Sequence, residues 1–577
     1  VTRLKFSLIG YRMRLLIAAA MFVVSIAMLL LGLGQRTIWA PPASVSMAVT
    51  FNSANPFVVI PHETLALHPG SPTVHVAGSQ AGAFISSGRE SDVMAWVGKS
   101  QYDSISKDKK SGELVTFSHP GSGIDVSPVG SDLWRTENSA SDSLDLKVVQ
   151  AEEAAVLVAT TGRADAPRQV ELVWPIFHDL TWSNVLLISG LVIFVAAIIF
   201  VIVSAMVLRR RRGPKRRIPK APKPPQYRQR KRAKMAPAKG RRSTRRAMIA
   251  APAAILVLAM LSACTPAAPS ASPKPSSAID APPVSVNFEQ IKRILTQVEA
   301  AAEAGDEGSD KKVLTSRFAG PALNIRTIHY FLRKKSASIP ALPAIVAKPL
   351  TFSLPAASDS WPRTIMAVTD EIGDSALPQM LVLQQANPRA NYKLWYNVRL
   401  MPGAKIPAVP AAEIGAIPVD SNSVFLKIAP KSVPAAYGDM LNNGASSLSA
   451  GLFDTTEDEF YTQVSQSQKD QTATLTTGKI TFQHTLGDKN VMSLATSAGG
   501  ALVAVYMTDI YTIKPVRVGS AVAVAGSEKL LLGADGSTKG VRSIYGDMLL
   551  FYVPALTDSD AIRLLGVTQG LISVRSL

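Results

Sequence analysis

One cysteine occurs in the 577 residues, Cys264, and it follows an apolar run over residues 247–263. Leu261 places an aliphatic residue three positions before it, and Ser262 and Ala263 place small residues between them. Because a cysteine thiolate is a nucleophile, this box suits transfer of a lipid to the sulfur, followed by cleavage of the chain before Cys264. The layout is that of a bacterial lipoprotein signal, placed inside the chain.

The apolar run before Cys264 has 17 residues, which suits a signal segment and is short for a membrane span. An uncleaved third span over residues 247–263 is the alternative. Residues 265–284 follow as a stretch rich in Pro, Ser and Ala, which predicts a semi-rigid tether. Both interpretations place the chain after the tether outside the membrane.

Three other patterns suggest chemistry, and for each we favour a structural explanation. His62, His68 and His75 are close in sequence, but no acidic residue is spaced with them on a predicted helix, as a metal site would need. Residues 566–570 imitate a nucleophile elbow with threonine in place of serine, and a tight strand turn explains them better. Residues 539–540, Lys-Gly, reverse the order that a phosphate-binding loop requires, which predicts a hairpin loop.

Four acidic residues gather where a helix is expected to begin: Asp454, Glu457, Asp458 and Glu459. Negative side chains at this end complement the helix dipole, so capping explains them better than acid–base catalysis. The sequence therefore predicts no catalytic residue, no cofactor and no metal site. A single cysteine also excludes a disulfide framework.

Two longer apolar runs predict transmembrane helices. Residues 15–34 give 20 uncharged positions and residues 185–208 give 24, whereas a hydrocarbon core about 30 Å thick needs roughly 20 helical residues. Buried helices of soluble proteins seldom run this far without a charge. We therefore expect two spans in a multidomain membrane protein.

The distribution of charge predicts the orientation of these spans. Residues 1–14 contain four basic side chains and no acid, and residues 209–246 contain 19 basic side chains and no acid. Because Lys and Arg near span ends stay on the cytoplasmic side, both segments are expected inside the cell membrane. Residues 36–184 and 265–577 are then outside, in a multi-pass protein. The net charge of +19 equals the charge of the 209–246 segment alone.

The basic linker, residues 209–246, is expected to be disordered, because its like charges repel one another and proline recurs. Each Lys or Arg beside a cytoplasmic leaflet contributes about 1 kcal/mol of attraction to anionic lipid, so we favour the membrane surface as its partner. Nucleic acid is less favoured, since Tyr227 is the one aromatic residue of the linker. An acidic protein is a further alternative. The residues expected to contact lipid headgroups include Arg209, Arg210, Arg211, Arg212, Lys215, Arg216 and Arg217.

Residues 36–184 show short apolar alternations separated by Gly, Pro, Ser and Asp. Residues 45–49, 144–148 and 170–174 repeat a period of two, which is typical of strands with one buried face. The regular spacing predicts an all-β, sandwich-like extracytoplasmic domain between the two spans.

The chain after the tether predicts an α+β region in two halves, residues 285–424 and 425–577. Asn287, with Gln290 three positions later, predicts the start of the first helix. Helices before an antiparallel sheet are expected in both halves, which is the one repeat-like signal. The expected helices of the second half are residues 432–444 and 455–469. The expected strands are residues 364–369, 379–386, 392–400, 480–484, 491–496, 502–513, 541–553 and 562–574.

Several strings of sequence carry a resemblance to a known family. They are Gly34–Thr37, Gly130–Trp134, Arg317–Leu323, Tyr545–Pro554 and Gln569–Ser573. Together with the layout of spans, they resemble a family of actinobacterial multi-span envelope proteins that have a carboxy-terminal domain of unknown function. The resemblance implies a layout and no activity. Helix-plus-curved-sheet halves are similar to NTF2-like or cystatin-like folds.

Two classes of function stay open. We favour a membrane-anchored cell-envelope module that is not an enzyme and whose outer regions bind an envelope protein, a cell-wall polymer or each other. A specific version is that residues 285–577 bind a small ligand or a lipid on a concave sheet face. The alternative is an enzyme, or a subunit of one, acting on envelope glycans or lipids, which would need paired carboxylates or a base and nucleophile in one cleft. Signalling through the basic linker is the weakest hypothesis, since no kinase, cyclase or DNA-reading motif accompanies it.

Overall fold

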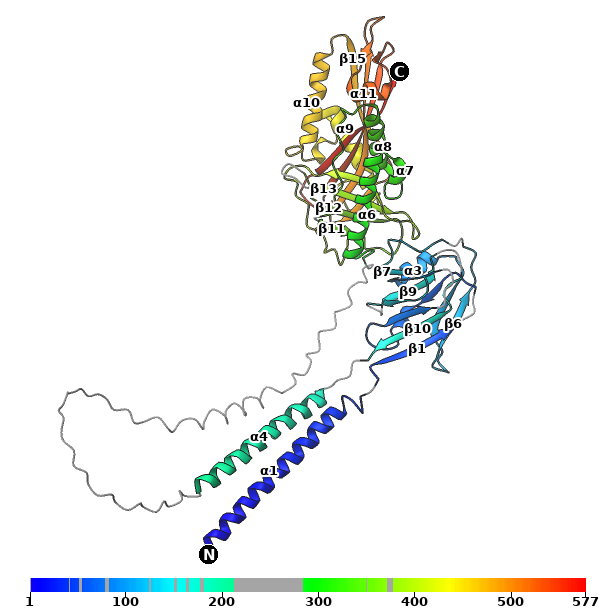
Figure 1. Cartoon of the computed structure of the whole chain (residues 1–577). Coiled ribbons are helices and arrows are strands. Elements are labelled where there is room, and N and C mark those ends of the chain that lie inside the picture. Colours follow the sequence, from blue (N-terminus) through cyan, green and yellow to red (C-terminus); the bar gives the residue numbers. More distant parts are fainter. Residues whose placement is uncertain are drawn as a thin grey trace, which may run out of the picture. The chain divides into compact units, whose positions relative to one another are not determined.

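Figure 1 shows the computed structural model of the chain. It describes residues 2–40, 42–50, 54–77, 82–123, 126–149, 153–161, 165–176, 181–211, 284–348, 350–370 and 377–577. These fall into two units, Val1–Pro41 with His178–Asp280 and Pro42–Phe177 with Ala281–Leu577. The first unit holds the two long helices, and the second holds the larger sheets.

Two helices are long and apolar enough to cross a membrane. α1 covers Thr2–Gly34 and α4 covers Thr181–Arg211, so they contain both predicted spans. α4 is longer than expected, because residues 209–211, the start of the predicted disordered linker, continue it as helix. Leu208 and the three arginines that follow it are good helix formers, which accounts for this extension.

Small residues let α1 and α4 pack closely. A Cβ atom added at Gly32 or Gly190 would lie 2.8 Å or 3.1 Å from a side-chain atom of the opposite helix, and Ser183 donates a hydrogen bond to the carbonyl of Gly32 (2.8 Å). Close approach at small residues is the usual way in which helices pack in lipid.

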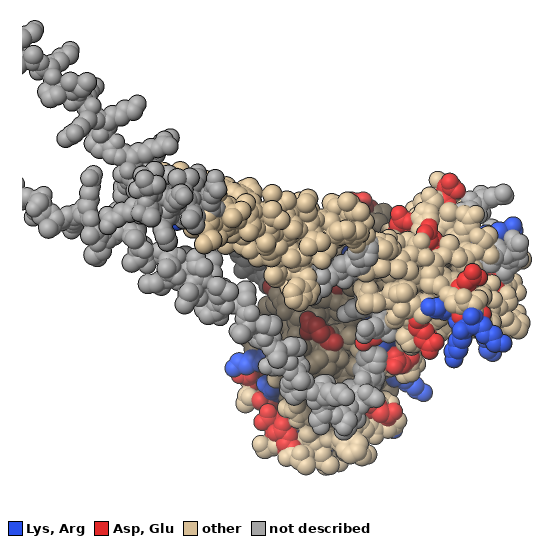
Figure 2. Space-filling view, turned by 90° about the horizontal axis from the view of Figure 1, so that it is seen from below, with Lys and Arg blue, Asp and Glu red and all other residues tan. Residues whose placement is uncertain are grey.

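Most of the apolar surface of this helix pair faces outward. Leu16 is 69% exposed and Ile188 is 65% exposed. Figure 2 shows a tan stretch without Lys, Arg, Asp or Glu, while acidic and basic side chains mix elsewhere on the visible face. An exposed apolar surface of this length is unfavourable in water, which agrees with a membrane environment.

The β region, residues 42–177, contains two sheets of strand order β1-β10-β3-β8 and β6-β5-β2-β9-β4-β7. Of the pairings between these strands, β2 with β5 is parallel and the others are antiparallel. The strands are β1 Ser44–Thr50, β2 Val58–Ile60, β3 Thr73–Ala77, β4 Ala83–Arg89, β5 Tyr102–Lys107, β6 Leu114–His119, β7 Thr136–Ala140, β8 Leu144–Lys147, β9 Ala154–Thr160 and β10 Gln169–Pro175.

The central strands β4 and β9 of the six-stranded sheet are buried on both faces. Ile85 belongs to one apolar cluster with Leu172 of the four-stranded sheet, whereas Phe84 packs on the opposite face with Trp96 of helix α3, Glu90–Val97. Because both faces are covered, β4 and β9 are buried at every position, and buried residues do not alternate with exposed ones along them. The region therefore differs from the expected all-β domain by α3 and by the one-turn helix α2, His62–Leu65.

Three helices begin the C-terminal region, residues 284–577: α6 Phe288–Gly308, α7 Lys311–Leu314 and α8 Gly320–Lys335. The predicted capping box at the start of α6 is confirmed. Asn287 accepts a hydrogen bond from the backbone N–H of Gln290 (2.8 Å), and the Gln290 side chain accepts one from the N–H of Asn287 (3.0 Å). The chain therefore leaves an extended segment and enters α6 at a defined residue.

A four-stranded antiparallel meander follows, with strands β11 Leu350–Pro355, β12 Arg363–Thr369, β13 Gln379–Gln385 and β14 Lys393–Arg399. The last three correspond to the predicted strands. The second half repeats the order of helices before a sheet, with α9 Val433–Asn443 and α10 Glu459–Thr474. Its strands are β15 Gly478–Leu486, β16 Met492–Ala495, β17 Ala501–Pro515, β20 Val541–Val553 and β21 Arg563–Ser576, and β18 Val522–Ala523, α11 Gly526–Leu532 and β19 Gly536–Ser537 lie between β17 and β20.

The two halves share one core instead of forming separate folds. Tyr396 and Val398 of β14 belong to the same apolar cluster as Leu502 and Met548 of the second sheet. Backbone pairing between Leu400 and Gly566 joins the two sheets directly.

Candidate functional site

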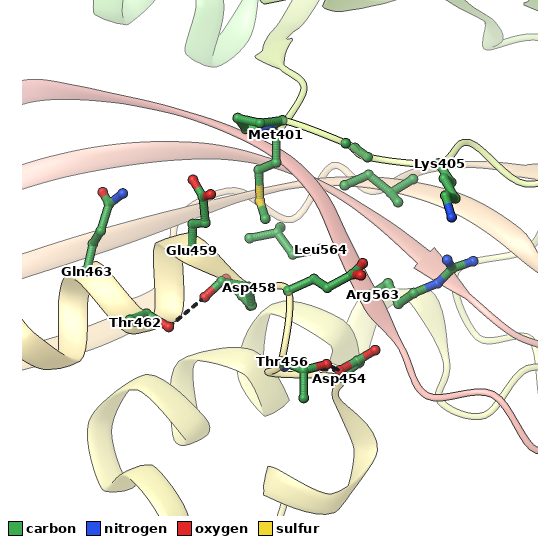
Figure 3. A pocket seen from close by; sticks show the side chains of 15 residues that line it. Met401, Lys405, Asp454, Thr456, Asp458, Glu459, Thr462, Gln463, Arg563 and Leu564 are labelled. Carbon is green, nitrogen blue, oxygen red and sulfur yellow. Dashed lines mark hydrogen bonds between the residues drawn. The ribbon is translucent and has the colours of Figure 1, made fainter.

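A cleft of about 420 Å³ opens in the C-terminal region between the start of α10, the loop after β14 and the start of β21. Figure 3 shows Met401 and Leu564 between two charged walls: Glu459 on one side, and Lys405 and Arg563 on the other. Lys405 and Glu459 are exposed, Met401 and Arg563 are half-buried, and Leu564 is buried beneath them. This is the type of lining that fixes a ligand by a few polar contacts over an apolar floor.

Two of the acidic residues in the cleft have structural roles. Asp458 caps α10 by accepting the backbone N–H of Tyr461 (2.8 Å), and it also accepts the hydroxyl of Tyr437 (2.7 Å). Burial raises the pKa of Asp458, opposed by these hydrogen bonds. Asp454 accepts the hydroxyl and the backbone N–H of Thr456, which lowers the pKa of Asp454. The capping interpretation is confirmed for Asp458, and Asp454 stabilises the turn before it.

Glu457 and Glu459 are exposed at the cleft, as is Lys405. Arg563 is half-buried, and its guanidinium lies 5.1 Å from the centre of the Tyr552 ring. Among the described residues that line the cleft there is no histidine, cysteine or serine. The arrangement can hold a ligand that carries groups of both charges.

A second group of titratable residues lies buried under α9 and α10. His484 of β15, Asp509 of β17 and Asp547 of β20 are all buried, and the His484 Nδ1–H donates to Asp509. Gln569 also donates to Asp509 (3.3 Å). On the far side of the imidazole, the amide nitrogen of Gln468 lies 2.7 Å from His484 Nε2, so both ring nitrogens have partners.

Burial decides the charge of this group. It lowers the pKa of His484 to about 4, and it raises the pKa of Asp509 to about 6. Burial and the neighbouring charge of Asp509 raise the pKa of Asp547 well above its usual range. Within the part of the chain that the structure describes, no three His, Cys, Asp or Glu side chains converge as a metal site would need. The sequence interpretation missed this group, although aspartates inside two apolar strands are a signal for it.

Charged residues also join the β region to the C-terminal region. The Asp132 carboxylate accepts Arg317 Nη1 (2.6 Å) and the backbone N–H of Tyr392 (2.7 Å), and both charged side chains are buried. Gln290 of α6 donates to the carbonyl of Asp132 (3.0 Å). Burial raises the pKa of Asp132 while the charge of Arg317 lowers it. One aspartate of the β region thus contacts three separate parts of the C-terminal region.

Two further arginines cross the same boundary. Arg363 Nη2 lies 2.8 Å from Asp92 Oδ1, with both side chains buried. Arg389 donates to the carbonyls of Trp96 and Val97 (2.8 Å each) at the end of α3, and to the Ser100 hydroxyl (2.7 Å). Cations at a helix carboxyl end are favoured by its free carbonyls and dipole.

Apolar contacts accompany these charges. Trp361, which precedes β12, packs against the α3 cluster that contains Phe57, Trp96 and Trp134. Its ring also lies 3.7 Å from the guanidinium carbon of Arg363. We call the contacts of Asp132, Asp92, Arg389 and Trp361 with their partners the inter-region surface.

The predicted lipidation site is not among the residues that the structure describes. Cys264 and its box, Leu261, Ser262 and Ala263, lie outside the described residues, as do Arg212, Lys215, Arg216 and Arg217. Arg209, Arg210 and Arg211 are the last residues of α4.

The other sequence patterns are placed by the structure. His62 contacts the Glu90 carboxylate and His75 contacts the Asp145 carboxylate, so these two histidines have separate partners. Gly540 follows β19 with a positive φ of 107°, as a loop residue. The tight turn expected at residues 566–570 is wrong: they lie inside β21. Glycine is needed there because a Cβ at Gly566 would lie 2.4 Å from a carbonyl oxygen of the neighbouring β14 segment.

These features define a chain with two long apolar helices, a sheet-rich region and a C-terminal α+β region. Residues 286–576, half of the chain, match the family model of a domain of unknown function, DUF8094. The chain belongs to this family. No curated protein and no solved structure matches it.

Proposed function

We propose that this protein is a membrane-anchored module of the cell envelope that binds a ligand in the cleft of its C-terminal region and is not an enzyme. The amino terminus and the basic linker are cytoplasmic, the β region and the C-terminal region are outside, and linker residues 209–217 contact anionic lipid. The halves of the C-terminal region are variants of the NTF2-like or cystatin-like arrangement. The proposal also retains the actinobacterial envelope origin that the sequence resemblance suggests.

The inter-region surface supports this topology. Because the β region and the C-terminal region contact each other, they belong on the same side of a membrane. If α1 and α4 both span, the end of α4 lies on the opposite side, and the chain must cross once more between residues 212 and 283. The run at residues 247–263 is the apolar stretch available for that crossing.

The observation that carries the binding proposal is the pairing of opposite charges across the apolar floor of the cleft. Exposed Glu457 and Glu459 suit a cationic group, and Lys405 and Arg563 suit an anionic group. Stem peptides of a cell-wall polymer carry free amino and carboxyl groups a few bonds apart, so they offer both. We propose such a peptide-bearing polymer as the ligand.

Co-sedimentation with insoluble cell wall tests the proposal. The full chain in detergent should sediment with purified wall, and the double variants Lys405→Gln/Arg563→Gln and Glu457→Gln/Glu459→Gln should each bind at least roughly tenfold more weakly, which is about 1.4 kcal/mol. Lys529→Gln is the matched control, because Lys529 is exposed and pairs with Asp535 away from the cleft. Equal sedimentation of all variants would remove the cleft as the binding site.

One observation favours the second candidate, an enzyme acting on envelope glycans. Asp458 has a raised pKa and lies beside exposed Glu457 and Glu459, and glycoside hydrolysis uses one protonated and one ionised carboxyl group. However, the Asp458 oxygens are held by the α10 cap and by Tyr437. Release of soluble sugar from purified wall by the full chain, abolished by Glu459→Gln, would establish the enzyme instead.

A further inference from the structure

The inter-region surface is formed by two stretches that are distant in sequence. Its contacts from the β region lie between residues 57 and 134, and its contacts from the C-terminal region lie between residues 290 and 392. α4 and the linker separate these stretches along the chain. None of the contacts just named involves the residues that connect the two regions.

The charges of this surface are complementary in a specific way. Asp132 and Asp92 come from the β region, and Arg317 and Arg363 come from the C-terminal region. All four side chains are buried, and Asp92 is also paired within the β region by Arg89 (2.9 Å). Asp132 takes its cation from the C-terminal region, so a partner without a matching cation would leave this carboxylate desolvated and uncompensated. The arrangement therefore selects one partner for each region, namely the other region of this chain.

Hydrogen bonds to the main chain add to the fit. Gln290 and Arg293 of α6 reach the carbonyls of Asp132, Leu133 and Trp134. In the other direction, Arg389 reaches carbonyls at the end of α3. Bonds of this kind depend on the backbone course of both regions, so they form when both are folded.

We propose that the inter-region surface is sufficient to hold the two regions together as a non-covalent complex when the chain between them is cut. A cleavage before Cys264 would then yield a two-helix protein that retains its C-terminal partner, instead of two independent products. This goes beyond the proposed function, because it holds whether or not the cleft binds cell wall.

The test uses the full chain with a recognition sequence for a site-specific protease placed between residues 265 and 283. After cutting in detergent, both pieces should elute together in size-exclusion chromatography and stay together on dilution. Separate elution of the two pieces would overturn the proposal.

A variant assigns the association to the named contacts. Arg317→Gln combined with Arg389→Ala should release the C-terminal piece roughly tenfold faster or more, since losses at an interface act mainly on dissociation. Arg168→Gln is the control, because Arg168 is exposed and pairs with Asp165 within the β region. Unchanged release by the double variant would show that these arginines do not hold the complex. The uncut variants are compared by circular dichroism, and if the double variant is unfolded, Arg389→Ala alone takes its place.

Discussion

Asp547 is a buried carboxyl group whose environment favours the protonated form. Burial and the charge of Asp509 raise its pKa well above the ordinary value near 4. The folded protein therefore keeps a proton that the unfolded chain releases as the pH rises. The free energy of unfolding should fall from about pH 4 up to the raised pKa of Asp547, by at most about 1.4 kcal/mol per pH unit from this group.

Asp547→Asn should flatten this decline. Asparagine cannot ionise and still offers an N–H to Asp509, so the variant should match the wild type near pH 4 and exceed its thermal stability by a growing margin up to pH 8. The measurement is the melting temperature of the full chain between pH 4 and 9. His484 has the opposite effect on the pH dependence of stability, and at lower pH. Because burial lowers its pKa to about 4, the free energy of unfolding falls as the pH falls from about 6.5 to 4. If the melting temperature of the wild type falls more steeply with pH than that of Asp547→Asn only below pH 6, Asp547 is not the group responsible for the decline.

Arg317 neutralises Asp132 at a position where both side chains are buried. Arg317→Gln leaves a buried carboxylate without its cation, which costs roughly 3–5 kcal/mol. We expect the denaturant midpoint of the full chain to fall accordingly. Pairing it with Asp132→Asn should restore part of the loss, because the uncompensated charge is removed. A single-variant loss below about 1 kcal/mol would mean that the pair is hydrated in solution.

At the scale of single elements, the cap of α6 is the clearest link between sequence and structure. Asn287→Ala removes the acceptor for the N–H of Gln290, and loss of an N-cap costs about 1 kcal/mol. Asn287→Ser retains an acceptor and should lose much less. Thermal unfolding of the two variants distinguishes them, and equal melting temperatures would contradict the importance of the cap.

Elements with a strong local signal were predictable. The α6 cap and the long strands β17 and β20 carry their own patterns, so the sequence predicts them close to their observed bounds. β11 was missed although Leu350, Phe352 and Leu354 alternate with polar residues, and it pairs with β12 as an edge strand of its sheet. α3 was missed because its eight residues are too few to show a helical period beside the alternation of the β region.

The cleft could not be predicted, since its walls come from three distant segments, and only their assembly brings Lys405 and Arg563 near Glu459. The sequence does predict that the acidic residues of the cleft lie at the start of a helix, and this is correct for Asp458. The charged pairs of the inter-region surface could not be predicted for the same reason, because their residues come from distant segments. Asp132 and Arg317 each lie in a string that carried the family resemblance, but nothing in one string identifies the other as its partner.

At the scale of the whole molecule, the proposed topology requires the chain to return to the side of the membrane on which the β region lies. The inter-region surface puts the C-terminal region on the same side as the β region. If α1 and α4 both span, as we propose, residues 247–263 supply the further crossing, either as a third span or as a signal. In both cases the C-terminal region is translocated. The two cases differ only in whether the chain stays intact before Cys264.

We predict cleavage there, because an aliphatic residue at Leu261 and small residues at Ser262 and Ala263 suit a lipoprotein signal, and 17 apolar residues are short for a stable span. An immunoblot of the natively expressed protein, tagged at both ends, should show two fragments that become one full-length band with Cys264→Ala or with an inhibitor of the lipoprotein signal peptidase. Ser262→Ala keeps a small residue and is the control that should still be cleaved. A single full-length band in every lane would leave an uncleaved three-span chain, in which the inter-region surface holds together regions that the linker also joins. Two fragments would instead make that surface the sole connection between the outer parts of the protein.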